Sequence, residues 1–285
     1  MGSILKIIRC CEMASLVSYV TAYYNRIFHE KGDPRSNDLF LMSSPVPMAM
    51  LLIGYWYFVT KLGKDLMEHR KPFNLEKVMV IFNVAQSIIN GVMGFQGIYY
   101  MFDKRFNLAC EVVHDSYDPF YVRVVSLMHL YLLIKISDLL DTVFMVLRKN
   151  YHQITFLHVY HHIGMALGTW LIVKYLPGGH VCFFGTINCL VHMFMYVYYF
   201  LAAKYPSYKS VWWKRNITQL QMLQFFIVLV HHSQALLNPD CEYPKYLLVI
   251  FISQNFLMIY LFARFYYKAY LAPKKDKPID KVKES

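Results

Sequence analysis

Seven segments of this chain are apolar enough to be membrane spans, and this pattern restricts the possible folds more than any other feature of the sequence. A helix needs about 20 apolar residues to cross the hydrocarbon core of a bilayer. Hydrophobic residues make up 57% of the chain, more than one soluble core of this size can bury. The sequence predicts an all-α, polytopic membrane protein with seven transmembrane helices in a single domain, residues 1–285. The segments are residues 46–60, 78–102, 121–147, 154–175, 181–203, 217–237 and 245–269.

The basic residues are distributed unevenly between the connecting loops. The loops after the first, third and fifth segments and the C-terminal tail are rich in Lys and Arg, whereas the other loops are acidic or neutral. Because cytosolic loops carry such an excess, we expect a cytosolic C-terminus. Residues 1–45 then form a lumenal or interfacial segment on the other side. This orientation accounts for the net charge of +11 without a nucleic-acid partner.

Two short motifs depend on this orientation. The tail, residues 270–285, ends with Lys281 and Lys283 and resembles a dilysine retrieval signal, which predicts residence in the endoplasmic reticulum membrane. The sequence Asn216-Ile-Thr218 matches a glycosylation sequon. We expect it to stay unmodified because it lies in a loop assigned to the cytosol.

Clusters of ionisable side chains occur inside the third and fourth predicted spans, where they are costly and therefore candidates for function. In the third segment, Lys135, Asp138 and Asp141 are spaced i, i+3, i+6 and share one helix face. The alternative role for them is an ion pair that only holds helices together. In the fourth segment, His158, His161 and His162 lie on one side of the helix, and three clustered histidines are unusual for a purely structural role.

The fifth and sixth segments also carry polar stripes. Asn188, His192 and Tyr196 follow one another at intervals of four residues, and Gln221 and Gln224 lie three residues apart. The tyrosine could instead pack or anchor at an interface, and the glutamines could form hydrogen bonds between helices. His231 and His232 lie near the far end of the sixth segment and are expected at the membrane interface.

Depth along the helices suggests that these stripes form one site. At a rise of 1.5 Å per residue, Asp141, His161, His192 and Gln224 lie about 9 to 17 Å from the cytosolic ends of their helices. Four helices therefore place polar groups in one layer. The same helices are apolar beyond this layer, and basic loops lie on its cytosolic side. A substrate with an anionic head and a hydrocarbon tail fits this gradient.

Four motifs together resemble the very-long-chain fatty acid elongases, the condensing enzymes of the endoplasmic reticulum. They are Lys135–Thr142, Gln153–His162, Asn188–Tyr199 and Thr218–Gln224, and the resemblance extends over nearly the whole chain. One departure is Asp138, where the family usually has the longer Glu. The resemblance implies seven spans, six of which ring a substrate tunnel that is open to the cytosol and closed at the lumenal end.

The resemblance also implies the reaction of a very-long-chain 3-oxoacyl-CoA synthase, an acyltransferase. Acyl-CoA and malonyl-CoA give 3-ketoacyl-CoA, CO2 and free CoA, the first step of very-long-chain fatty acid elongation. In the family, the HxxHH box is catalytic, which assigns a covalent acyl-histidine to His161 with help from His192. A neutral imidazole is a competent nucleophile near pH 7, so this role agrees with the residue chemistry. No metal and no cofactor other than the two CoA substrates is expected.

Further site residues follow from the stripes and from the resemblance. His158, His162, Asp141 and Asn188 are expected to assist catalysis. Five polar residues are expected to contact substrate: Lys135, Asp138, Tyr196, Gln221 and Gln224. Six basic residues are candidates for the CoA phosphates: Lys149, Lys204, Lys214, Arg215, Arg264 and Lys268. Candidate partners besides the lipid bilayer are other enzymes of the elongation cycle and a second copy of the chain.

Other protein classes explain the motifs less well. Membrane di-iron desaturases also contain HxxHH, but they need several histidine boxes, and only one occurs here. A seven-helix receptor or transporter would explain the spans but not a layer of histidines and acids.

The cysteines leave one pairing question open. Cys110 and Cys241 both fall in loops assigned to the lumen, where an oxidising environment permits a disulfide, and Cys182 is a rival partner. The family resemblance, which implies a lumenal bridge between these two loops, favours Cys110–Cys241.

Overall fold

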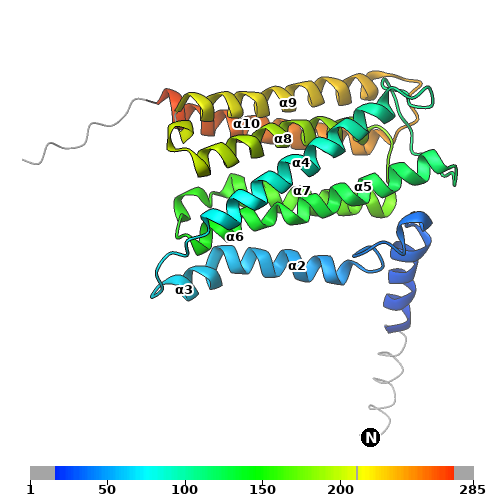
Figure 1. The fold of residues 1–285 in the computed structure, drawn as a ribbon. Helices are drawn as coiled ribbons and strands as arrows, with labels where there is room; N and C mark the ends of the chain where they lie inside the picture. The colour runs from blue at the N-terminus through cyan, green and yellow to red at the C-terminus, as the bar shows by residue number, and fades with distance from the viewer. Residues whose placement is uncertain (1–16, 210, 273–285) are drawn as a thin grey trace, which may run out of the picture.

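A computed structural model describes residues 17–209 and 211–272 of the chain (Figure 1). Every regular element in these ranges is helical, as predicted. Lys281 and Lys283 of the dilysine motif lie outside the described residues. The long helices are α2 (Pro45–Tyr57), α4 (Glu76–Met101), α5 (Pro119–Ser137), α7 (Phe156–Tyr175), α8 (Val181–Lys204), α9 (Val211–Leu237) and α10 (Lys245–Tyr266). Short helices are α3 (Gly63–Met67) and α6 (Leu139–Leu147), with single turns η1 (Arg26–Glu30), η2 (Pro34–Ser36), η3 (Phe58–Leu62), η4 (Tyr151–Gln153), η5 (Pro206–Lys209) and η6 (Tyr267–Leu271).

Six helical stretches in the described ranges are long and apolar enough to cross a membrane, one fewer than the sequence predicted. They are Pro45–Met67, Glu76–Met101, Phe156–Tyr175, Val181–Lys204, Trp212–Leu237 and Lys245–Leu271. The expected segment 121–147 is divided at Asp138 into α5 and α6. The 19-residue α5 carries two basic residues, Arg123 and Lys135, and α6 has only 9 residues. Neither is among these six stretches.

The connections alternate between the two ends of the bundle (Figure 1). The α3–α4, α6–α7 and α8–α9 connections and the end of α10 lie at the left of the view, and the α4–α5, α7–α8 and α9–α10 connections lie at the right. This grouping matches the grouping of loops by charge in the sequence. Helix α4 packs along α8, α9 along α10, and α5 along α7. Helix α2 lies at the edge of the bundle.

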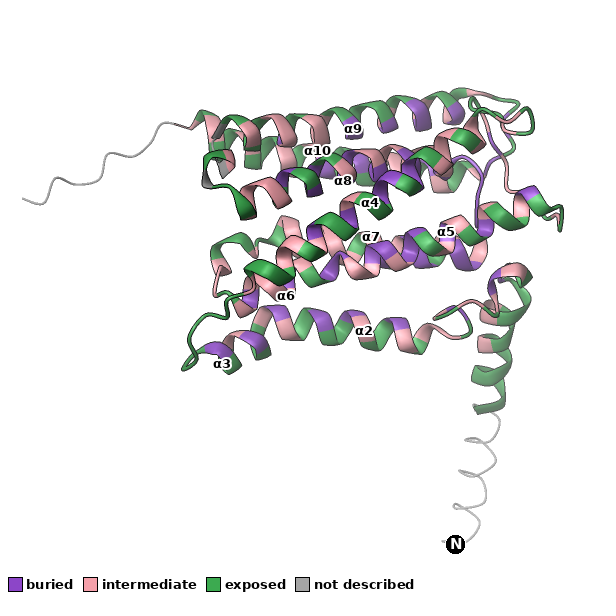
Figure 2. Ribbon diagram, viewed as in Figure 1, coloured by how far each residue is buried: buried purple, intermediate pink, exposed green. Residues whose placement is uncertain are grey.

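Helices α4 and α8 approach each other closely because glycines face the contact. A side chain on Gly94 would collide with Leu190, and one on Gly97 would collide with Thr186. The outward faces are apolar and exposed, as on α4, where Ile81 is 70% exposed. Figure 2 shows buried residues on the inward faces of the helices and exposed residues on the outward faces. This distribution suits a lipid environment around the bundle.

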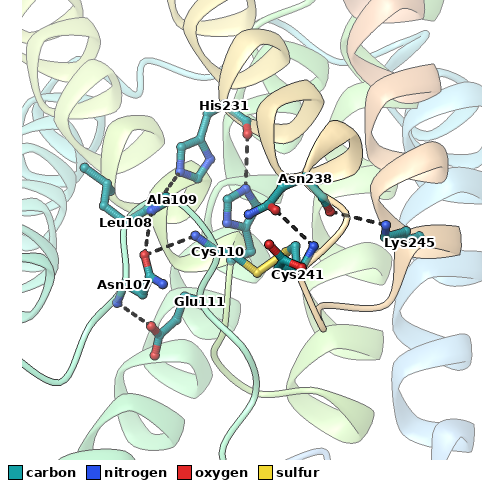
Figure 3. Close-up of a disulfide and its surroundings, with 11 residues drawn as sticks. Asn107, Leu108, Ala109, Cys110, Glu111, His231, Asn238, Cys241 and Lys245 are labelled. Carbon is teal, nitrogen blue, oxygen red and sulfur yellow. Dashed lines mark hydrogen bonds between the residues drawn. A yellow bond between two sulfur atoms is a disulfide. The ribbon is translucent and has the colours of Figure 1, made fainter.

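A disulfide joins Cys110, in the loop after α4, to Cys241, in the loop after α9 (Figure 3). The two Cα atoms are 5.6 Å apart, and Cys182 is a free thiol. His231 and His232 lie near the end of α9 and are 8% and 1% exposed, so they are buried inside the protein. They are buried because they bind backbone carbonyls inside the protein: a His231 ring nitrogen lies 2.9 Å from the oxygen of Leu108.

Candidate active site

A buried cation and carboxylate occupy the break between α5 and α6. Lys135 Nζ lies 2.8 Å from Asp138 Oδ2 and 3.1 Å from Asn188 Oδ1. The same ammonium group is 3.4 Å from Nδ1 of His192. The polar stripes of the third and fifth predicted spans therefore meet in the folded protein. A buried charge with several hydrogen-bond partners can be maintained in an apolar interior.

Tyr196 of α8 connects the two carboxylates of this centre. Its hydroxyl is 2.9 Å from Asp138 Oδ1 and 2.7 Å from Asp141 Oδ2, and the tyrosine is fully buried. Gln86 of α4 also donates to Asp138, at 3.1 Å. The shorter carboxylate at position 138 thus reaches Lys135, Tyr196 and Gln86.

The three histidines of the HxxHH box lie in the first turns of α7. Thr155 caps this helix by accepting a hydrogen bond from the backbone N–H of His158. The helix therefore begins at Phe156, two residues before the box. The ring centroids of His158 and His162 are 4.3 Å apart, and those of His161 and His162 are 5.7 Å apart. His161 has no hydrogen-bond partner among the described residues and is partly exposed, so its imidazole is free to meet a ligand.

Helix α6 links the histidine box to the charged centre. Asp141 contacts Tyr196, and the next residue, Thr142, places its hydroxyl 2.8 Å from Nε2 of His158. Adjacent residues of one short helix thus contact α8 and α7. The fold therefore brings the catalytic candidates of the third, fourth and fifth predicted spans into one region.

An apolar cavity of about 50 Å³ follows the charged centre along the bundle. Tyr131 belongs to both regions, because its hydroxyl donates to Asn188 Oδ1 at 2.8 Å and its side chain lines the cavity. Helices α4, α5 and α8 supply most of the lining, including Met93, Gly97, Tyr100, Leu127, Met128, Gly185, Thr186 and Cys189. Polar and apolar surfaces therefore succeed one another on the same three helices.

Helix α4 carries a buried polar stripe that was not among the predicted site residues. Asn83, Gln86 and Asn90 are all at most 3% exposed, and Asn83 Nδ2, Gln86 Oε1 and Asn90 Oδ1 have no hydrogen-bond partner among the described residues. The same face continues through Met93 and Gly97 to the cavity. Three amides at i, i+3 and i+7 inside the segment 78–102 were a readable signal for this stripe.

The two glutamines of α9 do not join the charged centre. Gln221 Nε2 lies 3.4 Å from the sulfur of Met195, and the buried Gln224 forms no hydrogen bond within the described residues. A depth along the helix does not fix the rotation of α9, and the rotation determines which residues Gln224 contacts.

The six basic candidates lie at the end of the bundle where α7 and α9 begin. Two of them are held by neighbouring groups: Lys149 Nζ donates to the backbone oxygen of Glu68 at 3.0 Å, and Arg215 Nε donates to the Tyr266 hydroxyl at 2.8 Å. Lys204, Lys214, Arg264 and Lys268 have exposed side chains.

These observations define a polytopic helical membrane protein in which basic groups, a histidine box, a buried Lys–Asp centre and an apolar cavity lie in sequence along the bundle. The chain belongs to the ELO family, because the GNS1/SUR4 family model matches residues 40–278. This confirms the resemblance to the very-long-chain fatty acid elongases.

Curated relatives cover most of the chain. "Very long chain fatty acid elongase 7" of Drosophila melanogaster is 41% identical over 265 residues, which are 91% of this chain and 80% of the relative. The protein of the same name from Rattus norvegicus is 39% identical over 260 residues, 90% of this chain and 92% of the relative. "Very long chain fatty acid elongase 1" of Homo sapiens is 35% identical over 247 residues, 86% of this chain and 88% of the relative.

Proposed function

We propose that this protein condenses a long-chain acyl-CoA with malonyl-CoA to 3-ketoacyl-CoA, CO2 and free CoA, as a 3-oxoacyl-CoA synthase of fatty acid elongation. The observation that carries the proposal is the order of surfaces on α4, α5 and α8. Each helix has polar groups beside Asp138 and apolar groups at the cavity. The apolar lining of the cavity suits the start of a hydrocarbon chain whose thioester stays among the polar groups.

In the first half-reaction, an imidazole nitrogen of His161 attacks the thioester carbonyl carbon. The carbon–sulfur bond breaks, and the thiolate takes a proton and leaves as free CoA. The acyl group remains on His161 as an acyl-imidazole, an activated acyl donor. The partial exposure of His161 and its lack of a partner among the described residues suit a nucleophile.

In the second half-reaction, malonyl-CoA loses CO2, and the electron pair of the broken carbon–carbon bond forms the new bond to the acyl carbon. His161 is released, and the product is two carbons longer. His192 assists at this stage, and its Nδ1 lies between Lys135 and Asp138, at 3.4 and 3.7 Å. These contacts hold the ring so that Nε2 is the nitrogen left for the reacting groups.

The topology, location and orientation of the chain are part of the same proposal. Helices α5 and α6 together form a seventh span, and α4 to α10 ring the substrate tunnel with α2 outside. The chain resides in the endoplasmic reticulum membrane with its N-terminus in the lumen and its C-terminus in the cytosol. The disulfide between Cys110 and Cys241, at the end opposite the basic groups, supports this orientation.

CoA binds at the basic end in this proposal. Its phosphates meet the exposed side chains of Lys204, Lys214, Arg264 and Lys268, together with Lys149 and Arg215. Gln221 and Gln224 contact the pantetheine chain when substrate is bound. No further cofactor is needed.

Intact-protein mass spectrometry of the purified enzyme tests the covalent step. Incubation with acyl-CoA alone should release CoA and add one acyl mass, and later malonyl-CoA should remove it as 3-ketoacyl-CoA. His161→Ala should abolish the adduct, while His152→Ala, on the loop before α7, should keep it. A wild-type enzyme that elongates without an acyl increment would exclude the covalent mechanism. A wild-type enzyme that forms no 3-ketoacyl-CoA would exclude the function.

A further inference from the structure

We propose that Tyr55 of α2, acting through Thr142, holds the imidazole of His158 in the tautomer that is protonated on Nδ1; the proposal rests on the proposed condensing function. The Tyr55 hydroxyl lies 2.7 Å from Thr142 Oγ1, and Thr142 Oγ1 lies 2.8 Å from His158 Nε2. A chain of two hydrogen bonds thus runs from the outermost membrane helix to the histidine box. Tyr55 is a positioning residue in this assignment, because it acts through Thr142.

Burial of the two hydroxyls determines which group donates and which accepts in each of these two hydrogen bonds. Tyr55 is 8% exposed and Thr142 is fully buried, so water has little access to either hydroxyl. The Tyr55 hydroxyl has no other partner among the described residues. If His158 Nε2–H donated to Thr142 and Thr142 donated to Tyr55, the tyrosine proton would be buried without an acceptor. An unsatisfied buried donor is costly.

The opposite direction gives both buried hydroxyl protons an acceptor. Tyr55 donates to Thr142, Thr142 donates to Nε2 of His158, and the ring proton is left on Nδ1. Thr142 forms no other hydrogen bond with described residues, so its single proton is available for the imidazole. His158 therefore presents a hydrogen-bond donor, and not a base, to the rest of the site. A fixed donor can stabilise negative charge that develops on a substrate oxygen.

Tyr55 is directed toward the bundle, unlike its neighbours on α2. Its neighbours Ile53 and Trp56 are 66% and 53% exposed, because α2 directs most of its surface away from the bundle. The Tyr55 hydroxyl is instead turned inward to a residue of α6 that contacts the candidate site. The two hydrogen bonds therefore connect α2 to a histidine of the HxxHH box.

Activity measurements with four single variants and one double variant test the proposal. Tyr55→Phe removes the terminal donor, so kcat should fall about tenfold, the equivalent of one hydrogen bond, with KM for malonyl-CoA unchanged. Thr142→Val should lower kcat at least as much, whereas Thr142→Ser keeps the hydroxyl and should retain most activity. Tyr57→Phe, on the exposed face of the same helix, is the matched control. Adding Tyr55→Phe to Thr142→Val should cause no further loss.

A measurement that does not need activity separates this proposal from the proposed function. In protein labelled with 15N-histidine, the resonances that disappear in His158→Gln should report a protonated Nδ1 and an unprotonated Nε2. In Tyr55→Phe they should shift toward a mixture of tautomers. A wild-type His158 protonated on Nε2 would overturn the proposal, and so would Thr142→Ser losing as much activity as Thr142→Val. Failure of the wild type to condense its substrates would instead overturn the function.

Discussion

The ammonium group of Lys135 lies 2.8 Å from the carboxylate of Asp138, and the side chains are only 1% and 3% exposed. Asp138 directly follows the last residue of α5, so the ion pair lies where the helix is interrupted. The interruption lets Asp138 and Asp141 both contact Tyr196 from the adjoining helix. The charged centre thus lies at the break in the predicted third span.

Removing one partner of this ion pair should be more harmful than removing both. Lys135→Met leaves a buried carboxylate without its cation, which should cost about 3–5 kcal/mol of stability. The double variant Lys135→Met/Asp138→Leu should recover part of the loss in thermal unfolding experiments in detergent, while remaining inactive. Asp138→Glu should retain both stability and activity. If the double variant were less stable than Lys135→Met, the unpaired buried carboxylate would not be the main cause of the lost stability.

The cavity should limit the length of the acyl chain. Gly185 lines it, and an added Cβ there would meet only Tyr131, at 3.8 Å, so the backbone tolerates a side chain. Gly185→Leu should therefore fill the cavity and shift the product distribution toward shorter chains. The control is Gly168→Leu on α7, where an added Cβ meets nothing within 4 Å. Equal product profiles for the two variants would show that the hydrocarbon chain lies elsewhere.

The exposed basic groups at the start of α9 should affect binding more than turnover. Lys214→Gln/Arg215→Gln removes two charges near the expected CoA phosphates, so the KM for malonyl-CoA should rise severalfold, and more at low salt. Lys104→Gln, at the opposite end of the bundle, should leave KM unchanged. A fall in kcat without a change in KM would indicate a structural role.

Glu111, next to the disulfide, should make stability depend on pH. Its carboxylate accepts a hydrogen bond from the backbone N–H of Asn107 at 2.6 Å, but burial raises its pKa above the ordinary value. The folded state therefore holds this proton more tightly than the unfolded state. The stability from this group is present below the ordinary glutamate pKa of about 4.3 and is lost as the pH rises through the raised pKa.

Glu111→Gln should remove this dependence, because the amide oxygen can still accept the bond from Asn107. The difference in unfolding temperature between Glu111→Gln and the wild type should change in favour of the variant as the pH rises from about 4 toward neutrality. Asp115→Asn, at an exposed position in the same loop, is the control. A constant difference across this range would rule out a raised pKa for Glu111.

Much of the site was readable from the spacing of residues along single helices. The HxxHH box and the stripe of Asn188, His192 and Tyr196 were correctly placed on one face each, because the helical repeat alone determines which side chains share a face. The α4 amides carried the same kind of signal and were overlooked. Gln221 carried it too, yet its nearest hydrogen-bonding partner is Met195. Periodicity defines a face but not what that face contacts.

The sequence by itself determined the helical class of the protein, the positions of most spans and which loops share an end of the bundle. These properties follow from local hydropathy and charge, which act on each segment separately. Only the tertiary structure decided that the third span is interrupted at Asp138, that Tyr196 connects two carboxylates, and that Tyr55 reaches the histidine box through Thr142. Such contacts depend on the rotation and spacing of neighbouring helices, which side-chain packing sets at close approaches such as Gly94 against Leu190.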